Sequence, residues 1–132
     1  MRVLVIDDDT GMTDLLTILL TPASSQVLTA NTAEEGIRIL LKEKPDVVIL
    51  DLLLPPENGL QVCQQIRELS NVPLLILSDF DTPGMVAQAL DHGADDYLTK
   101  PVSSGTLIAR LRKLVRRSNP LKKTDPLTKP TI

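Results

Sequence analysis

Aromatic residues and cysteine are scarce in this sequence, and no long uninterrupted apolar run occurs. Trp is absent and Phe and Tyr occur once each, so a folded core has to be built from aliphatic side chains. The single cysteine, Cys63, excludes an intramolecular disulfide and a cysteine-rich zinc site. The longest apolar stretches, such as VVILDLLLPP, are short and broken by Asp and Pro, so we expect no membrane-spanning segment.

The length of 132 residues is enough for one domain with one core. A strand pattern begins directly at Arg2, without the charged and apolar regions of a signal peptide. We therefore expect a cytoplasmic protein.

Charge is distributed unevenly along the chain. Eight of the 14 Lys and Arg residues lie in residues 110–132, together with one of the 17 acidic residues. This pattern favours a solvated helix end followed by a linker. Contact of this segment alone with nucleic acid is disfavoured because no aromatic residue interleaves the charges. We expect one domain over residues 1–117 and a basic, proline-containing linker or tail over residues 118–132.

Short apolar runs alternate with helical periodicity along the first 117 residues. Strands are predicted over residues 2–6, 25–30, 46–50, 73–77 and 95–98. Helices are predicted over residues 10–20, 33–44, 58–69, 83–91 and 104–117, and residues 51–57 are expected to form a proline-rich loop. Such alternation predicts an α/β fold: a doubly wound, five-stranded parallel sheet with helices on both faces.

Chemically active side chains follow four of these strands. They are Asp7 and Asp8 after RVLVI, Asp51 after DVVIL, Ser78 after PLLIL, and Lys100 after DDYLT. Because a parallel sheet gathers the carboxyl ends of its strands along one edge, these residues are expected to form one site. Carboxylates with one lysine and one hydroxyl suit a Mg²⁺ ion and a phosphoryl group.

The adjacent acids after the first strand, Asp7, Asp8 and Asp9, repel one another unless a cation offsets their charge. Mg²⁺ prefers one or two carboxylates together with water and phosphate oxygens. The alternative is a solvated turn in which Asp9 or Thr10 caps the following helix. We expect Asp9 to be a cap rather than a ligand.

Asp51 ends the most apolar strand. Beside a Mg²⁺ ion, its carboxylate could attack phosphorus and form an acyl phosphate. Lys100 could neutralise charge on the phosphoryl oxygens, and Ser78 could donate one hydrogen bond to them. The ordinary alternatives are a surface lysine at position 100, a strand-end cap at Ser78 and a simple core role for Tyr97.

Four motifs resemble the receiver (phosphoacceptor) domain of two-component response regulators. They are VLVIDDD at 3–9, DVVILDLLLPPENGL at 46–60, LLILSD at 74–79 and GADDYLTKP at 93–101. The resemblance covers residues 2–117 and implies a flavodoxin-like sheet of strand order 2-1-3-4-5. It also implies a domain that is not an enzyme, because it catalyses only its own phosphoryl transfer and dephosphorylation.

The resemblance implies that Asp51 accepts a phosphoryl group from a sensor histidine kinase. It implies a Mg²⁺ ion on Asp8 and Asp51, with Asp7 helping through water and the backbone carbonyl of Leu53 as a further ligand. Lys100 takes the position of the lysine that contacts the phosphoryl group.

Ser78 and Tyr97 take the switch positions that this resemblance implies. The last helix and its basic extension are similar to those of the subfamily that carries a C-terminal winged-helix DNA-binding domain. We therefore expect control of transcription, with DNA contact only through an effector domain that residues 1–132 do not contain.

Three residues are expected to tune the chemistry. Asp79 replaces the small residue usual after the Ser/Thr switch position, and its carboxylate would repel a phosphoryl group or have to swing aside. Leu53 and Phe80 occupy positions that tune hydrolysis in this family, and both are apolar. They could exclude the attacking water, so we expect a slowly decaying phosphoryl state.

The winged-helix subfamily forms dimers through charge pairs on the face made by residues 83–91, 95–98 and 104–117. Asp96 and Arg110 match one such pair, whereas Val86 and Thr106 stand where a second Arg–Glu pair is expected. A homodimer through this face is therefore plausible but weakened.

Particular residues also bear on three other functions. A pseudo-receiver that binds partners without phosphorylation stays open because of Asp79. A phosphatase that turns over an aspartyl phosphate needs a second Asp two residues beyond the nucleophile, where Leu53 stands. A flavodoxin is disfavoured because the first loop is acidic rather than a Ser, Thr and Gly phosphate cradle.

Overall fold

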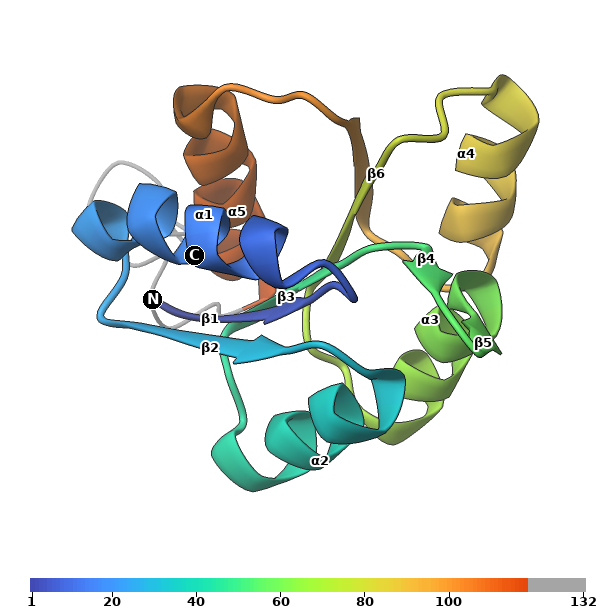
Figure 1. Ribbon diagram of the computed structural model, residues 1–132, viewed down its shortest axis with the longest axis horizontal. Helices are drawn as coiled ribbons and strands as arrows, with labels where there is room; N and C mark the ends of the chain where they lie inside the picture. The colour runs from blue at the N-terminus through green and yellow to red at the C-terminus, as the bar shows by residue number, and fades with distance from the viewer. Residues whose placement is uncertain (119–132) are drawn as a thin grey trace, which may run out of the picture.

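A five-stranded parallel sheet forms the centre of residues 1–118, the part of the chain that the computed structural model describes (Figure 1). Its strands are β1 (Arg2–Ile6), β2 (Gln26–Ala30), β3 (Val47–Leu50), β6 (Leu74–Ser78) and β7 (Asp96–Thr99). They lie in the order β2-β1-β3-β6-β7, and every neighbouring pair is parallel. This confirms the predicted fold and strand order. The expected linker or tail lies outside the described residues from position 119 onward.

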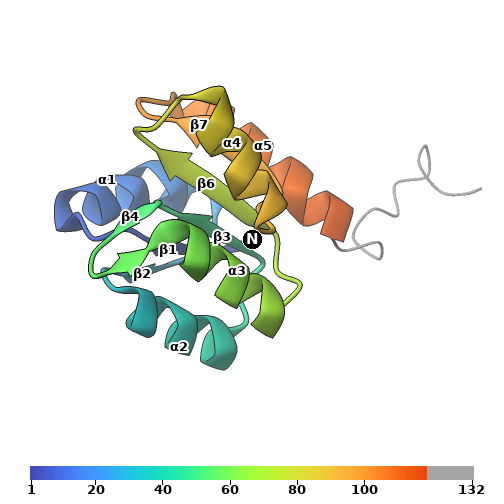
Figure 2. The same ribbon diagram turned by 90° about the vertical axis from the view of Figure 1, so that its right-hand side faces the viewer.

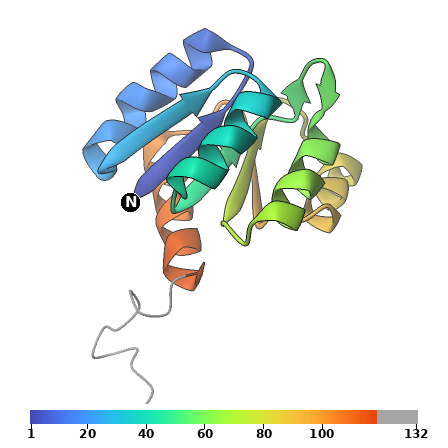
Figure 3. The same ribbon diagram turned by 90° about the horizontal axis from the view of Figure 1, so that it is seen from below.

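Five helices cover the two faces of the sheet: α1 (Thr10–Leu20), α2 (Ala33–Glu43), α3 (Gly59–Leu69), α4 (Pro83–Asp91) and α5 (Ser104–Ser118). A short 3₁₀ turn, η1 (Thr21–Ala23), follows α1. Helices α1 and α5 pack on one face, and α2, α3 and α4 pack on the other (Figures 2 and 3). Within residues 1–118, no helix combines the length and apolarity needed to cross a membrane.

Each face of the sheet has its own aliphatic core. In β1, Leu4 and Ile6 point to the α2–α3–α4 side, and Val3 and Val5 point to the α1–α5 side, as the two-residue repeat of a strand requires. All four side chains are buried, so β1 lies within the core on both faces. A strand buried in this way reads as a continuous apolar run, which is why the sequence revealed it.

Side-chain caps fix where the helices begin. The Asp9 carboxylate accepts hydrogen bonds from the backbone N–H groups of Gly11 and Met12, so its predicted capping role is confirmed. Thr32 caps α2 in the same way through the N–H of Glu35. These caps set the start of each helix directly after the end of a strand.

The segment after β3 differs from the predicted proline-rich loop. Two short antiparallel strands, β4 (Leu53–Leu54) and β5 (Glu57–Asn58), form a small hairpin there. The connecting Pro55–Pro56 peptide bond is cis. Strands of two residues are too short to carry a periodic pattern, so they cannot be predicted from the spacing of apolar residues.

Gly59 lets the start of α3 approach this hairpin closely. Its N–H donates to the carbonyl oxygen of Leu52, with an N···O distance of 3.1 Å. A Cβ atom added at position 59 would lie 2.1 Å from that oxygen, which is backbone and cannot rotate away. The chain that follows Asp51 is therefore held in place by a contact that only glycine permits.

We expect Gly59→Ala to lower the free energy of unfolding by about 2–3 kcal/mol because backbone must shift to relieve the clash. Urea unfolding followed by circular dichroism measures this. Gly84→Ala in α4 is the matched control, since nothing lies within 4 Å of the added Cβ. That variant should be stabilised by about 0.5–1 kcal/mol. Equal stability of the two variants would contradict the role assigned to Gly59.

Candidate functional site

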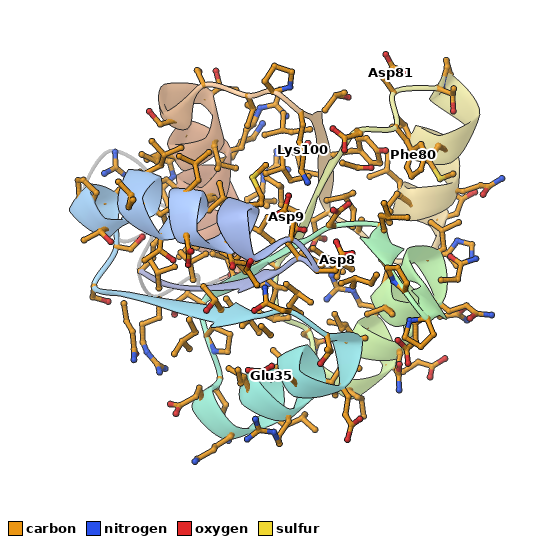
Figure 4. The ribbon with its side chains drawn as sticks, in the orientation of Figure 1. Asp8, Asp9, Glu35, Phe80, Asp81 and Lys100 are labelled. Atoms are coloured by element: carbon orange, nitrogen blue, oxygen red, sulfur yellow. The ribbon has the colours of Figure 1, made fainter. Side chains whose placement is uncertain are left out.

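The structure brings three acidic side chains together at the carboxyl edge of the sheet. One carboxylate oxygen from each of Asp7, Asp8 and Asp51 lies within 4.8 Å of the others. Asp7 and Asp51 are buried, and Asp8 is exposed. Figure 4 shows Asp8 and Asp9 at the end of β1, with Lys100 on the same side of the molecule and Glu35 away from them on α2.

The Lys100 ammonium group bridges the two buried carboxylates. Its Nζ donates to Oδ2 of Asp7 at 3.0 Å and to Oδ2 of Asp51 at 3.1 Å. The remaining oxygens accept backbone hydrogen bonds: Oδ1 of Asp7 from the N–H of Asp9 at 3.0 Å, and Oδ1 of Asp51 from the N–H of Leu53 at 3.1 Å. Each buried carboxylate is thus fixed by one cation and one backbone group.

Burial and neighbouring charges shift the pKa values of Asp51 and Lys100. Burial is the main cause that raises the pKa of Asp51, and repulsion from Asp7 adds to it, against the opposing effects of the Leu53 N–H and Lys100. Burial alone would lower the pKa of Lys100, but hydrogen bonds and charge attraction from Asp7 and Asp51 raise it. The lysine therefore stays protonated, and the Asp51 carboxylate gains from any further cation.

The donor set of this site suits a hard divalent cation. Asp7, Asp8 and Asp51 offer carboxylate oxygens, and the backbone of Leu53 adjoins Asp51. Mg²⁺ binds oxygen ligands of this kind and retains water in its remaining positions. The exposure of Asp8 leaves one side of the cluster open to solvent, which is the side from which an ion and its water can enter.

Ser78 and Tyr97 bond to the backbone of the same residue, Phe80. The Phe80 N–H donates to the Ser78 Oγ at 3.1 Å, and the Tyr97 hydroxyl donates to the Phe80 carbonyl. Ser78 is fully buried at the end of β6, and its own carbonyl accepts the backbone N–H of Lys100 at 2.8 Å. Ser78 and Tyr97 were both predicted from the sequence as switch residues. Their shared contact with the backbone of Phe80 is visible only in the structure.

Leu53, Asp79 and Phe80 all lie at the surface around the site. Leu53 and Phe80 are 54% and 44% exposed. Figure 4 shows Phe80 together with Asp81 on the loop between β6 and α4. Asp79 is also exposed, so its charge is solvated in this structure.

Asp96 and Arg110 form an ion pair within a single chain. The Arg110 Nη1 donates to both carboxylate oxygens of Asp96, each at 2.9 Å. The pair joins β7 to α5, and α4 packs against β7 as well. Figure 2 shows these three elements at one end of the sheet. The predicted charge pair of the α4–β7–α5 face is therefore already satisfied in the monomer.

Comparison with known proteins assigns the family. Residues 3–112 match the family described as the response regulator receiver domain. The chain belongs to this family. A receiver domain is a signalling switch rather than an enzyme, and the cluster of Asp7, Asp8 and Asp51 is typical of a receiver Mg²⁺ site.

Curated relatives of this receiver are regulators of transcription. The probable transcriptional regulator ycf27 of Guillardia theta is 39% identical over 89% of this chain and 46% of its own length. The transcriptional regulatory protein AfsQ1 of Streptomyces coelicolor is 37% identical over 86% of this chain and 51% of its own. The receiver thus spans about half the length of the curated relatives it matches.

Solved structures agree with the fold. A two-component response regulator from Clostridium difficile matches with a TM-score of 0.85 and 28% identity over 89% of this chain and 98% of its own. The BeF₃-activated N-terminal receiver domain of Klebsiella pneumoniae RstA matches with a TM-score of 0.83 and 28% identity, over 88% and 99% of the two chains.

The raised pKa of Asp51 predicts a pH-dependent cost to folding. A carboxyl group whose pKa rises on folding binds its proton more tightly in the folded state, so stability falls as pH rises from the ordinary value of 3.8 through the raised pKa. Without divalent cations at neutral pH, Asp51→Asn should therefore raise the free energy of unfolding, because the neutral amide avoids the cost of burying a charged carboxylate. Urea unfolding between pH 4 and pH 8 measures this.

With Mg²⁺ present, the wild type should become more stable than Asp51→Asn, because the ion stabilises the folded state that binds it. At a concentration of about 100 times its Kd, the wild type should gain about 2.7 kcal/mol, and Asp51→Asn should gain much less. A variant less stable than wild type without divalent cations, or an equal gain from Mg²⁺ in both proteins, would contradict this account of the site.

Proposed function

We propose that this receiver is the phosphorylation-controlled switch of a two-component system, in which Asp51 accepts a phosphoryl group from a sensor histidine kinase. The observation that carries the proposal is the Asp51 carboxylate, bonded to the Lys100 ammonium group and placed beside Asp7 and Asp8. A nucleophilic carboxylate, a cation for the phosphoryl oxygens and acids for a metal are the parts that phosphoryl transfer needs.

In the proposed reaction, a carboxylate oxygen of Asp51 attacks the phosphorus of a phosphohistidine. The P–N bond breaks, its electron pair leaves with the imidazole, and an aspartyl phosphate forms. Mg²⁺ bound by Asp8 and Asp51, by Asp7 through water and by the Leu53 carbonyl would neutralise charge on the phosphoryl oxygens. Lys100 already contacts Asp51, so its ammonium group needs only a small movement to reach a phosphoryl oxygen.

The backbone of Phe80 offers a route from the phosphoryl group to the surface. To donate to a phosphoryl oxygen, the Ser78 hydroxyl would turn and give up the hydrogen bond that it accepts from the Phe80 N–H. Tyr97 is bonded to the carbonyl of Phe80 and would respond to the same movement. Phosphorylation would then favour one of two arrangements of the β6–α4 loop and the α4–β7–α5 face.

The proposed output is control of transcription, since the curated relatives are named as transcriptional regulators. In that role residues 1–117 are the receiver and residues 118–132 are a basic linker. The proposed location is the cytoplasm. DNA contact would require a C-terminal effector domain beyond residue 132. A homodimer through the α4–β7–α5 face would gain little from Asp96 and Arg110, because they already pair within one chain.

Incubation with Mg²⁺ and acetyl phosphate should add one phosphoryl group to the wild type and none to Asp51→Asn, because the variant lacks the nucleophile. Intact-mass spectrometry measures the adduct. Lys100→Met should label more slowly, by about 10²-fold or more, because the phosphoryl charge loses its counter-ion.

The competing hypothesis is a pseudo-receiver, which Asp79 kept open. It predicts no adduct on the wild type although Mg²⁺ still binds, and that result would overturn the proposal. Asp79→Ala distinguishes a site that reacts slowly from one that does not react. If the charge of Asp79 only slows phosphorylation, Asp51 in this variant should be labelled faster than Asp51 in the wild type.

The aspartyl phosphate should decay slowly because the exposed Leu53 and Phe80 present no polar group that could orient an attacking water. Leu53→Gln should speed loss of the phosphoryl group by about tenfold, which is about 1.4 kcal/mol of barrier. Leu15→Gln on α1 is a matched control, since Leu15 is 47% exposed and Leu53 is 54% exposed. Rapid decay in the wild type, or equal effects of the two substitutions, would contradict the role of Leu53.

A further inference from the structure

The end of β2 lies beside the acidic segment of the site, although β2 contributes no carboxylate to it. Ile6 and Ala30 are the last paired residues of β1 and β2, and the two strands run side by side (Figure 1). The Asp7 N–H extends this pairing by donating to the carbonyl oxygen of Ala30, with an N···O distance of 3.1 Å. The residue that follows β2, Asn31, is therefore next to the segment that carries Asp7 and Asp8.

The side-chain amide of Asn31 holds the peptide group that joins Asp7 to Asp8. Its Nδ2 donates to the carbonyl oxygen of Asp7 at 2.8 Å and to Oγ1 of Thr13 at 3.2 Å. A primary amide has two N–H donors, so each donor has one acceptor here. Because the Asp7 carbonyl and the Asp8 N–H belong to one planar group, this contact fixes the direction in which the chain enters Asp8.

Thr13 helps to determine which way the Asn31 amide faces. Thr13 is buried in α1, and its hydroxyl donates its only proton to the carbonyl oxygen of Thr10 at 3.1 Å. The Thr13 oxygen can then only accept a hydrogen bond from Asn31, and the Asp7 carbonyl is an acceptor in any case. The reverse orientation of the amide would place its Oδ1 against two acceptors, so the Nδ2 group has to face the acidic segment.

Asp8 differs from the other two acids of the cluster in how its carboxylate is held. The carboxylates of Asp7 and Asp51 are each fixed by Lys100 and by a backbone N–H. Within residues 1–118, the exposed Asp8 carboxylate has no hydrogen bond or ion pair. Its position within 4.8 Å of the other two acids therefore depends on the backbone that Asn31 holds.

We propose that Asn31 is a positioning residue for the divalent-cation site, because it holds the Asp7–Asp8 peptide and so keeps the Asp8 carboxylate beside Asp51. The inference rests on the proposed function, since it concerns the Mg²⁺ ion that phosphoryl transfer to Asp51 would use. Groups that orient the ligands of a metal without touching the ion typically change its affinity by about 10–100-fold. A neutral amide can do this without adding a further negative charge to three clustered acids.

Asn31→Ala should weaken Mg²⁺ binding by about tenfold, because the freed peptide lets the Asp8 carboxylate leave the cluster. Titration of the full 132-residue chain with MgCl₂, followed by ¹H–¹⁵N NMR, measures the Kd of the folded protein. A loss of stability alone would leave this Kd unchanged.

The amide signal of Asp8 gives a second reading that does not require the ion. In chelator-treated protein, Asn31→Ala should shift this signal, because the Asp7 carbonyl of the same peptide group loses a hydrogen bond. Asn31→Leu should reproduce both effects, since leucine has nearly the size of asparagine but lacks both donors. Agreement of the two variants would attribute the effects to the lost hydrogen bonds rather than to an empty space.

Thr32→Ala is the matched control, because Thr32 is the next residue and its side chain caps α2 through the N–H of Glu35. This variant should unfold at a lower urea concentration than the wild type but bind Mg²⁺ with the same Kd. Equal Kd values for the wild type and Asn31→Ala would overturn the proposal. An equal loss of affinity in Thr32→Ala, or an unchanged Asp8 signal in Asn31→Ala, would overturn it as well.

Failure of the proposed function would give a different result. If Asn31→Ala binds Mg²⁺ more weakly but acetyl phosphate adds no phosphoryl group to the wild type, Asn31 still positions a metal ligand and the phosphorylation switch is wrong. A wild type that binds no Mg²⁺ would overturn both proposals.

Discussion

One ammonium group between two buried carboxylates is the constraint on which the functional edge of this receiver depends. Unpaired charges are costly in a protein interior, so two buried carboxylates at Asp7 and Asp51 require the Lys100 ammonium group between them. They come from the ends of β1, β3 and β7, and their contacts join three strands that are far apart in sequence. The backbone N–H of Lys100 also bonds to Ser78 and adds β6 to the same arrangement. The chemistry and the alignment of the sheet edge thus rest on one set of contacts.

This arrangement leaves the two buried carboxylates one positive charge for two negative charges. The imbalance favours a further cation at the exposed Asp8 side, and it makes the site sensitive to any group that draws Lys100 away. Ser78 is connected to the same edge, but its hydroxyl is occupied by the N–H of Phe80. A ligand that engages both Lys100 and Ser78 would therefore compete with contacts inside the domain.

Much of the fold could be predicted because the strands are buried on both faces and the helices carry clear caps. RVLVI and DVVIL are continuous apolar runs, and the parallel topology that they imply places Asp7, Asp51 and Lys100 at one edge without further information. The β4–β5 hairpin was missed because two-residue strands have no period. The hydrogen bonds that join Ser78 and Tyr97 to the backbone of Phe80 could not be predicted. They depend on how two side chains turn toward a loop, and sequence spacing does not encode this. Asp96 and Arg110 were identified as a pair, but only the structure places that pair within one chain.

The scarcity of aromatic residues has a practical consequence for observing this molecule. Tyr97 is the only tyrosine and tryptophan is absent, so ultraviolet emission from the polypeptide originates almost entirely from one phenol ring. That ring lies in β7, and its hydroxyl bonds to the loop that carries Phe80, next to the carboxylate site. The tyrosine emission should therefore change when this loop rearranges, because the ring is bonded to the loop. An unmodified sample is enough for that measurement.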